Sequence, residues 1–443
     1  MPDSFNTLSH PGGRRLKLAI VNGILVTQNR NRQILRDNLL VEDGVITKVG
    51  KFRDRVDDTL DATDCIVMPG LINCHTHVSM ALMRGMADDL KLEQFLEKTF
   101  SIDALRTPED IEIGAELGCI EMARSGTTCF LDLYYSQDVI ARAVERVGLR
   151  GYLGWAVLDE EHTTQKGKPL ANCERFVKEY ADSTLVNPVV APQGVYVCSD
   201  DTLMAAKDIA SRAGTFCHYH LSETRREVYD YVRQKGLRPV EHLEKIGFLS
   251  KGDVAAHCVW LTVNELKALA RGGVSAAHCP TSNMKLASGG VAPLPEMFDE
   301  GICVCLGTDG CSSNNSLDMF QEMKTAALLQ KSSRWDASVM PAQKTLDIAT
   351  IGAARALGAE REIGSLEPGK RADIVVVDGR NPAMTPTRLD NIVANLVYAG
   401  PSKAVRDTII DGRFVLRDRQ IVCVDEERIV DGAASAVNRL LSV

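Results

Sequence analysis

The sequence has little positive charge and no long hydrophobic run. Its 51 Lys and Arg residues are outnumbered by 59 Asp and Glu residues, which gives a formal net charge of −8 at pH 7 and a pI near 5.7. No run of basic residues is longer than a pair. Binding to nucleic acid or to an anionic membrane depends on clustered positive charge, so neither partner is expected. No segment reaches the roughly 18 uninterrupted apolar residues of a membrane-spanning helix.

The sequence also lacks CxxC pairs and any regular cysteine spacing. Its 13 cysteines are scattered, and some lie in apparent strands, such as Cys303 and Cys305. We expect free thiols that pack as small apolar residues in a reducing compartment. The apolar stretch after Lys17 is broken by Asn22 and Gly23 and has no small-residue cleavage site, which argues against a signal peptide. These features predict a cytoplasmic protein.

What is present is a globular composition, with 45% hydrophobic and 25% charged residues in 443 positions. Both ends of the chain contain short alternating apolar segments separated by Asn-Gly and Asp-Gly turn signals. We predict that these ends, residues 1–67 and 371–443, form one small composite β-sandwich domain. Residues 68–370 then form the larger domain.

The central region alternates short apolar strands with longer helical patterns such as 108–124, which is typical of repeated βα units. Eight strands are predicted, at 66–74, 127–133, 151–157, 187–191, 215–221, 253–258, 273–278 and 303–308. Eight parallel strands with crossover helices predict an α/β fold of the (β/α)8 TIM-barrel type. Such a barrel carries its active site at the carboxyl ends of its strands, so unusual residues are expected there.

Histidines gather at those strand ends. His75 and His77 end the first strand as an HxH pair, and the period of two places both rings on the same side, where they can bind one ion. The fifth strand carries His218 and His220, which also share a face. We favour His220 as the ligand because Glu223 follows it closely and can transfer protons beside the metal. His218 is then a packed, hydrogen-bonded residue.

Asp309 ends the eighth strand and completes a set of three histidines and one carboxylate, which suits Zn²⁺ or Fe²⁺ with one position open for water. His257 ends the sixth strand and is predicted to assist the bound water, the alternative being a core histidine. His278, at the end of the seventh strand, either contacts substrate or holds its strand in place, and the sequence favours neither role.

Several motifs together resemble the amidohydrolase superfamily: 69–77, His220-Leu-Ser-Glu223, Ala256-His-Cys258, 282–289 and 307–315. Within it, the chain is similar to the methylthioadenosine/S-adenosylhomocysteine deaminases and 5'-deoxyadenosine deaminases, a branch whose 83–90 segment is shared with chlorohydrolase relatives. The resemblance covers nearly the whole chain. It implies one metal ion, most simply zinc with iron as the alternative, bound by His75, His77, His220 and Asp309. It also implies proton transfer by Glu223, His257 and Asp309, and a homo-oligomer.

Two substrate positions depart from the pattern of these deaminases. Asp103 stands where they have a Glu that holds the ribose hydroxyls, and Gln193 stands where they have a His after the fourth strand. The resemblance therefore implies substrate contacts by Asp103, Gln193, Glu223 and Asp309, with an altered substrate range.

The predicted function is hydrolytic deamination of an adenosine-type nucleoside: 5'-deoxyadenosine, methylthioadenosine, S-adenosylhomocysteine or adenosine. The products are ammonia and the inosine analogue, and the enzyme is an aminohydrolase of cyclic amidines. One alternative is a hydrolase of another aminated or chlorinated ring, guanine-like, pterin or s-triazine. Another is an inactive scaffold, which the retention of all four metal ligands and Glu223 argues against.

Overall fold

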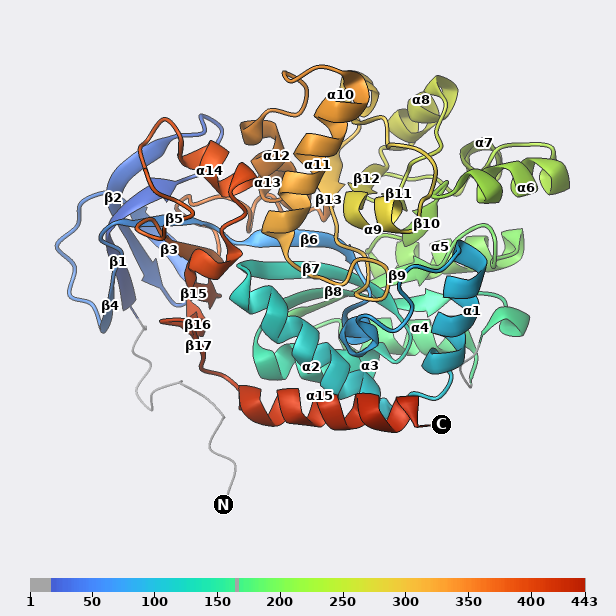
Figure 1. Cartoon of the computed structure of the whole chain (residues 1–443), viewed down its shortest axis with the longest axis horizontal. Coiled ribbons are helices and arrows are strands. Elements are labelled where there is room, and N and C mark those ends of the chain that lie inside the picture. The colour runs from blue at the N-terminus through green and yellow to red at the C-terminus, as the bar shows by residue number, and fades with distance from the viewer. Residues whose placement is uncertain (1–16, 164–166, 443) are drawn as a thin grey trace.

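The computed structural model describes residues 17–163 and 167–442, so residues 1–16 of the predicted composite domain lie outside the described part. The chain has two regions (Figure 1): a sheet built from both ends of the chain, and a larger α/β region in which parallel strands are covered by helices. The mixed α/β class is confirmed.

Strands from the two ends of the chain pair in one nine-stranded sheet, in the order β17-β16-β15-β14-β5-β1-β2-β3, with β4 beside β1. Its members are β1 (Lys17–Val26), β2 (Ile34–Glu42), β3 (Val45–Val49), β4 (Asp58–Asp61), β5 (Cys65–Pro69), β14 (Ile374–Asp378), β15 (Val405–Ile410), β16 (Arg413–Arg417) and β17 (Gln420–Ile421). Hydrogen bonds join all nine strands, whereas the division into the two packed sheets of a sandwich stays a prediction. The pairing is mixed, because β1 runs parallel to β4 and β5.

The predicted strand at 66–74 is in fact two strands in different sheets. It divides at Gly70 into β5, which joins the terminal sheet, and β6 (Leu71–Thr76), which joins the α/β region. A Cβ atom at Gly70 would lie 2.0 Å from the hydroxyl oxygen of Thr128. Only glycine therefore lets the chain pass this closely to the neighbouring strand β7.

The α/β region contains two four-stranded parallel sheets, β6-β7-β8-β9 and β10-β11-β12-β13. The further strands are β7 (Thr127–Tyr134), β8 (Arg150–Val157), β9 (Val186–Pro192), β10 (His218–Leu221), β11 (Val254–His257), β12 (Ser275–His278) and β13 (Val304–Leu306). At one seam, Val190 and Cys217 form a parallel bridge. At the other, the Asp309 amide donates to the His75 carbonyl over 2.9 Å. All eight predicted strands overlap strands of these sheets.

Helices cover the parallel sheets (Figure 1). They are α1 (Leu92–Asp103), α2 (Pro108–Arg124), α3 (Gln137–Val147), α4 (Pro169–Glu179), α5 (Asp200–Ala213), α6 (Arg225–Lys235), α7 (Pro239–Lys245), α8 (Val263–Gly272), α9 (Pro280–Lys285), α10 (Leu294–Asp299), α11 (Met319–Arg334), α12 (Ala342–Ile348), α13 (Ile351–Ala356), α14 (Ile392–Tyr398) and α15 (Glu426–Leu441), with 3-10 turns η1 (Val78–Met83), η2 (Glu160–His162) and η3 (Ser402–Ala404). None of the described helices is long and apolar enough to cross a membrane.

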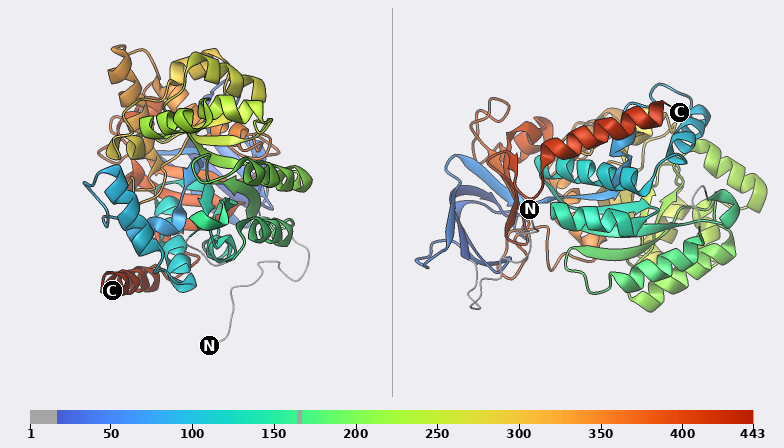
Figure 2. Two further views of the ribbon diagram at one scale, coloured as in Figure 1. Left: turned by 90° about the vertical axis from the view of Figure 1, so that its right-hand side faces the viewer. Right: turned by 90° about the horizontal axis from the view of Figure 1, so that it is seen from below.

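Helix α2 has the bounds that the sequence pattern predicts, because Thr107 caps it in a capping box with Asp110. Helix α15 was not anticipated among the predicted C-terminal strands. It packs along α2 (Figure 2, right). It also contacts η1, where Leu82 packs against the small side chains of Ala433 and Ala436. All thirteen cysteines are free and most are buried, as expected.

Candidate metal centre

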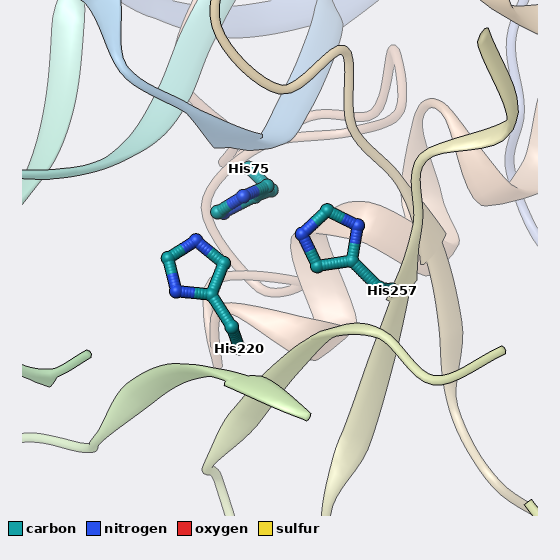
Figure 3. A group of neighbouring side chains, drawn as sticks. All are labelled: His75, His220 and His257. Atoms are coloured by element: carbon teal, nitrogen blue, oxygen red, sulfur yellow. The ribbon is translucent and has the colours of Figure 1, made fainter. Parts of the chain in front are cut away.

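Three strand ends bring histidine rings to one place. The ring of His75 lies 5.0 Å from that of His77, 5.0 Å from that of His220 and 5.2 Å from that of His257, measured between centroids. Figure 3 shows the last two of these rings directed toward His75 from different strands. The predicted gathering of histidines at the carboxyl ends of the parallel strands is therefore present.

The side-chain atoms that could hold a metal ion form two overlapping groups. His75, His77 and Asp309 make one, His75, His220 and His257 the other, and within each group the atoms lie within 4.8 Å of one another. The Oδ1 atom of Asp309 lies 3.4 Å from Nε2 of His75 and 3.2 Å from Nε2 of His77. Imidazole nitrogens and one carboxylate oxygen around one point are a donor set that suits a divalent transition metal.

Backbone carbonyls orient two of these rings. Nδ1 of His77 lies 2.5 Å from the carbonyl oxygen of Leu133, and Nδ1 of His220 lies 2.7 Å from that of Gln193. A carbonyl accepts only from a protonated nitrogen, so in the neutral form of each ring the proton is on Nδ1 and Nε2 keeps its lone pair. That is the tautomer in which a histidine binds a metal ion.

His75 is oriented by a second histidine. Its Nδ1 lies 2.8 Å from Nε2 of His218, whose own Nδ1 donates to the carbonyl of Val254 over 2.8 Å. His218 is thus a buried, hydrogen-bonded residue behind His75. The Nε2 atom of His75 is buried and has no hydrogen-bond partner among the described residues. A lone pair buried in this way is costly unless it binds something, and a metal ion fits it.

Serine hydroxyls hold the carboxylate of Asp309. Ser282 and Ser313 both donate to its Oδ2, over 2.6 Å and 2.8 Å, and the amide of Gly310 donates to Oδ1 over 2.8 Å. Burial raises the pKa of Asp309, but the adjacent imidazole rings of His75 and His77 outweigh burial and hold that pKa well below its usual value. The carboxylate is therefore ionised, which is the form of a carboxyl group that can bind a metal ion.

Glu223 faces His257 at the edge of this centre. Its Oε2 lies 3.7 Å from Nε2 of His257. Burial raises the pKa of Glu223, and the neighbouring imidazole of His257 opposes that rise. A carboxyl whose pKa is raised keeps its proton to higher pH, which suits a group that donates a proton to a substrate.

The backbone at three strand ends is left-handed. The φ angles are 48° at Ser222, 71° at His257 and 62° at Asp309. Residues other than glycine adopt this conformation at a cost, and such residues concentrate at functional sites. At His257 and Asp309 the change to left-handed backbone ends the alternation of side chains along the strand. The direction of each of these two side chains therefore does not follow from strand periodicity.

Asp103 lies in a buried polar cluster beside the centre. Its Oδ1 accepts from the hydroxyl of Tyr134 and from Nη1 of Arg106, the latter over 3.2 Å. Arg106 is fully buried and also donates to the Ser79 carbonyl. The Tyr134 ring lies 6.0 Å from that of His77, so this cluster adjoins the histidines. Arg106 was not predicted as a site residue, although it follows Asp103 by only three residues in the sequence.

Gln193 and His278 also take part in hydrogen bonding around the centre. The backbone carbonyl of Gln193 accepts from both the amide and Nδ1 of His220. The backbone carbonyl of His278 accepts from the amide of Gly307 over 2.9 Å, whereas both of its ring nitrogens are buried without a partner among the described residues. The backbone of His278, not its ring, therefore forms the bond that ties its strand to the next one.

A model of the amidohydrolase family matches residues 66–415. A 5'-deoxyadenosine deaminase from Methanothrix thermoacetophila is 41% identical over 93% of this chain and 97% of its own length. A 5-methylthioadenosine/S-adenosylhomocysteine deaminase from Thermodesulfovibrio yellowstonii is 38% identical over 92% and 95%. Among solved structures, an adenosine deaminase from Xanthomonas campestris with bound zinc is 35% identical, with a TM-score of 0.93 over 97% of this chain and 99% of that one.

Proposed function

Because this chain belongs to the amidohydrolase family, we propose that it is a metal-dependent deaminase that releases ammonia from adenosine-type nucleosides. The observation that carries the proposal is the shared position of His75 in two groups of atoms that could hold a metal ion, near a half-buried acid, Glu223. The relatives described above are deaminases of adenosine-type compounds, which supports the same substrate class here.

We propose that the two parallel sheets close into a (β/α)8 barrel and that residues 68–370 form the catalytic domain. The bridge between Val190 and Cys217 and the bond from Asp309 to His75 support closure, because they span the two seams. Residues 1–67 and 371–443 form the composite β-sandwich domain in this proposal. We also propose that the protein is a cytoplasmic homo-oligomer. The free cysteines support the cytoplasmic location, because thiols stay reduced in that compartment.

We propose that His75, His77, His220 and Asp309 hold one divalent ion, zinc in the first instance and iron as the alternative. The unpartnered Nε2 of His75 supports this assignment, as do the carbonyl bonds that orient His77 and His220. Such an ion lowers the pKa of water from 15.7 to about 7 in favourable sites, which supplies a nucleophile at neutral pH.

The chain's own residues then position the reactants and move the protons. Asp309 and His257 orient the attacking water and receive its proton. Both residues lie at strand ends beside the proposed metal site. Glu223 protonates the ring nitrogen next to the carbon that is attacked, so that the ring can accept electron density. The amino group leaves as ammonia after it takes up a proton. Glu223 and Asp309 therefore contact the substrate as well as the water.

Asp103 and Gln193 are proposed to bind the rest of the substrate. The carboxylate of Asp103 can accept from a ribose hydroxyl, and the amide of Gln193 offers both a donor and an acceptor. The pairing of Asp103 with Arg106 favours a second candidate function, hydrolysis of a guanine-like, pterin or s-triazine ring, because it uses part of the acceptor capacity that a ribose needs.

The test is ammonia release from adenosine, 5'-deoxyadenosine, methylthioadenosine, S-adenosylhomocysteine, guanine, pterins and triazines by zinc-loaded protein. We expect nucleosides to be the best substrates and one divalent ion to be bound per chain. His77→Ala should lose both the ion and the activity. Turnover of free bases or triazines alone would identify the second candidate, and full activity in metal-free protein would disprove both.

A further inference from the structure

The short helix α9 contacts both groups that are proposed to orient the water. Ser282 donates its hydroxyl to Oδ2 of Asp309 over 2.6 Å, and Nδ2 of the next residue, Asn283, lies 3.0 Å from Nδ1 of His257. Both α9 side chains are buried, with 0% and 4% exposure. Helix α9 follows β12 and contributes none of the proposed metal ligands.

We propose that Ser282 and Asn283 are positioning residues with separate tasks. Ser282 turns the carboxylate of Asp309 so that one oxygen faces the ion, and Asn283 sets the orientation and proton position of the His257 ring. The inference rests on the proposed metal site. It deepens the proposed function, because it assigns different tasks toward the water to Asp309 and His257.

The task of Ser282 follows from the distribution of bonds on Asp309. Oδ2 accepts two hydroxyl bonds, from Ser282 and Ser313, while Oδ1 accepts from the amide of Gly310 and lies within 3.4 Å of Nε2 of both His75 and His77. A carboxylate can present either oxygen if nothing restrains it. Two donors on Oδ2 therefore direct Oδ1 toward the ligating nitrogens, as groups behind a metal ligand commonly do.

The task of Asn283 follows from its contact with the far side of His257. With the amide in this orientation, its N–H donates to the bare Nδ1 of the ring, so the ring proton of neutral His257 is on Nε2. Nε2 lies 3.7 Å from Oε2 of Glu223. In this arrangement His257 orients the water by donating a hydrogen bond to its oxygen, which leaves Asp309 as the member of the pair that receives the proton.

Helix α9 is itself held firmly enough to orient other groups. At its end, Nζ of Lys285 donates to side-chain oxygens of Asp88 and Asn315 and, over 3.2 Å, to the carbonyl of Ser312. Asp88 belongs to the segment after β6, and the other two to the segment after Asp309. This lysine therefore ties α9 to both loops that carry the metal ligands of β6 and β13.

The test compares zinc affinity, by competition with a chelator, with kcat and KM in two alanine variants. Ser282→Ala should weaken zinc binding about 10-fold or more, because bonds behind a ligand are worth roughly 10–100-fold in metal affinity. Asn283→Ala should keep the affinity of the wild type and its KM but lower kcat about 10-fold, as expected for one lost hydrogen bond of roughly 1.4 kcal/mol. Ser282→Thr retains the hydroxyl and should restore zinc binding. Met284→Leu, at a 48% exposed position of α9, is the control.

Two results would overturn the proposal: wild-type zinc affinity in Ser282→Ala, or equal zinc loss in Asn283→Ala and Ser282→Ala. If Ser282→Ala does not fold, Ser313→Ala removes the other donor to the same oxygen and should also weaken zinc binding. The zinc measurement needs no substrate. It therefore distinguishes failure of this inference from failure of the proposed deamination, which the wild type would reveal by releasing no ammonia from any nucleoside.

Discussion

His75 shows how one residue links the strand, the buried interior and the proposed chemistry. Its Nδ1 is bonded to His218 and its Nε2 has no partner, so the two nitrogens have different roles. His218 is fully buried, and burial lowers its pKa to about 3. It therefore stays neutral at working pH and can accept from Nδ1 of His75 while it donates to the carbonyl of Val254.

Glu223 is expected to transfer protons without binding the ion. Glu223→Gln should retain the metal but lower kcat by roughly 10²-fold or more, because general acid–base groups contribute about 10²–10⁴. Metal analysis and steady-state kinetics on the same preparation check this. Glu227→Gln tests the loop itself, because Glu227 accepts from the backbone amides of Ser222 and Glu223. Loss of the ion in Glu223→Gln would show instead that Glu223 is a ligand.

Asp103 is expected to determine how strongly a ribose is required. Asp103→Asn should lower kcat/KM for nucleosides by roughly 10–100-fold, the range for a lost bond to a charged acceptor of about 1.5–3 kcal/mol, and should spare free bases. Tyr134→Phe removes one donor from Oδ1 but leaves the carboxylate, so its effect should be smaller. Unchanged nucleoside kcat/KM in Asp103→Asn would contradict a ribose-binding role.

At the scale of the element, strand ends supply the residues of the site, and helices support the loops that carry them. The strands β6 and β10 supply histidines by simple alternation, whereas His257, at the end of β11, and Asp309, three residues after β13, are left-handed. Helix α11 supports these loops from behind. Its Glu322 accepts from the amide of Thr281 in α9 over 2.9 Å and from Nδ2 of Asn314 over 3.0 Å.

Glu322 is expected to make stability depend on pH. Burial raises its pKa from 4.5 to about 7. Below pH 4.5 the carboxyl is protonated in both states. Between pH 4.5 and about 7 the unfolded chain loses the proton while the folded chain keeps it, so this group's contribution to stability falls as pH rises.

The melting temperature of the wild type, measured from pH 4.5 to 7.5 against Glu322→Gln, should reveal this effect. The variant keeps a carbonyl acceptor but cannot ionise, so the wild type should lose stability relative to it over that window. Glu362→Gln, at a side chain that is 61% exposed, is the control. A wild-type profile parallel to that of Glu322→Gln would show that Glu322 does not titrate in this range.

At the scale of the whole molecule, a buried charge network joins the α/β region to the terminal sheet. Arg150, at the start of β8, donates to both carboxylate oxygens of Asp373, over 3.0 Å and 3.2 Å, and to Asp411 over 2.7 Å. Its side chain is only 5% exposed. Asp373 precedes β14 and Asp411 lies between β15 and β16, so one guanidinium contacts two parts of the terminal sheet.

Arg150→Met should therefore destabilise the whole protein. Removing one partner of a buried ion pair costs about 3–5 kcal/mol, because the other charge is left unpaired. Calorimetry should show a large fall in melting temperature, while kcat of the folded fraction stays near that of the wild type. Arg380→Met removes an arginine that is 81% exposed and should change neither quantity. Equal melting temperatures for both variants would mean that the network contributes nothing to stability.

Local periodicity was sufficient to predict much of this protein. Alternation placed His75 beside His77 at a strand end, the helical pattern of residues 108–124 gave the bounds of α2, and the irregular cysteine spacing indicated free thiols. These features depend on neighbours within a few residues, which a sequence displays directly. The preference for His220 over His218 as a ligand followed from the position of Glu223 three residues after His220 and stays a prediction.

Only the tertiary structure decided which distant segments meet. Ser282 bonds to Asp309 across 27 residues and His75 to His218 across 143, and neither pairing has a local signature. The division of one apolar segment at Gly70 between two sheets depends on the close approach of Thr128. The physical reason is common to these cases: hydrogen bonds and steric contacts form between whichever strands and helices pack together, and packing is a property of the whole chain.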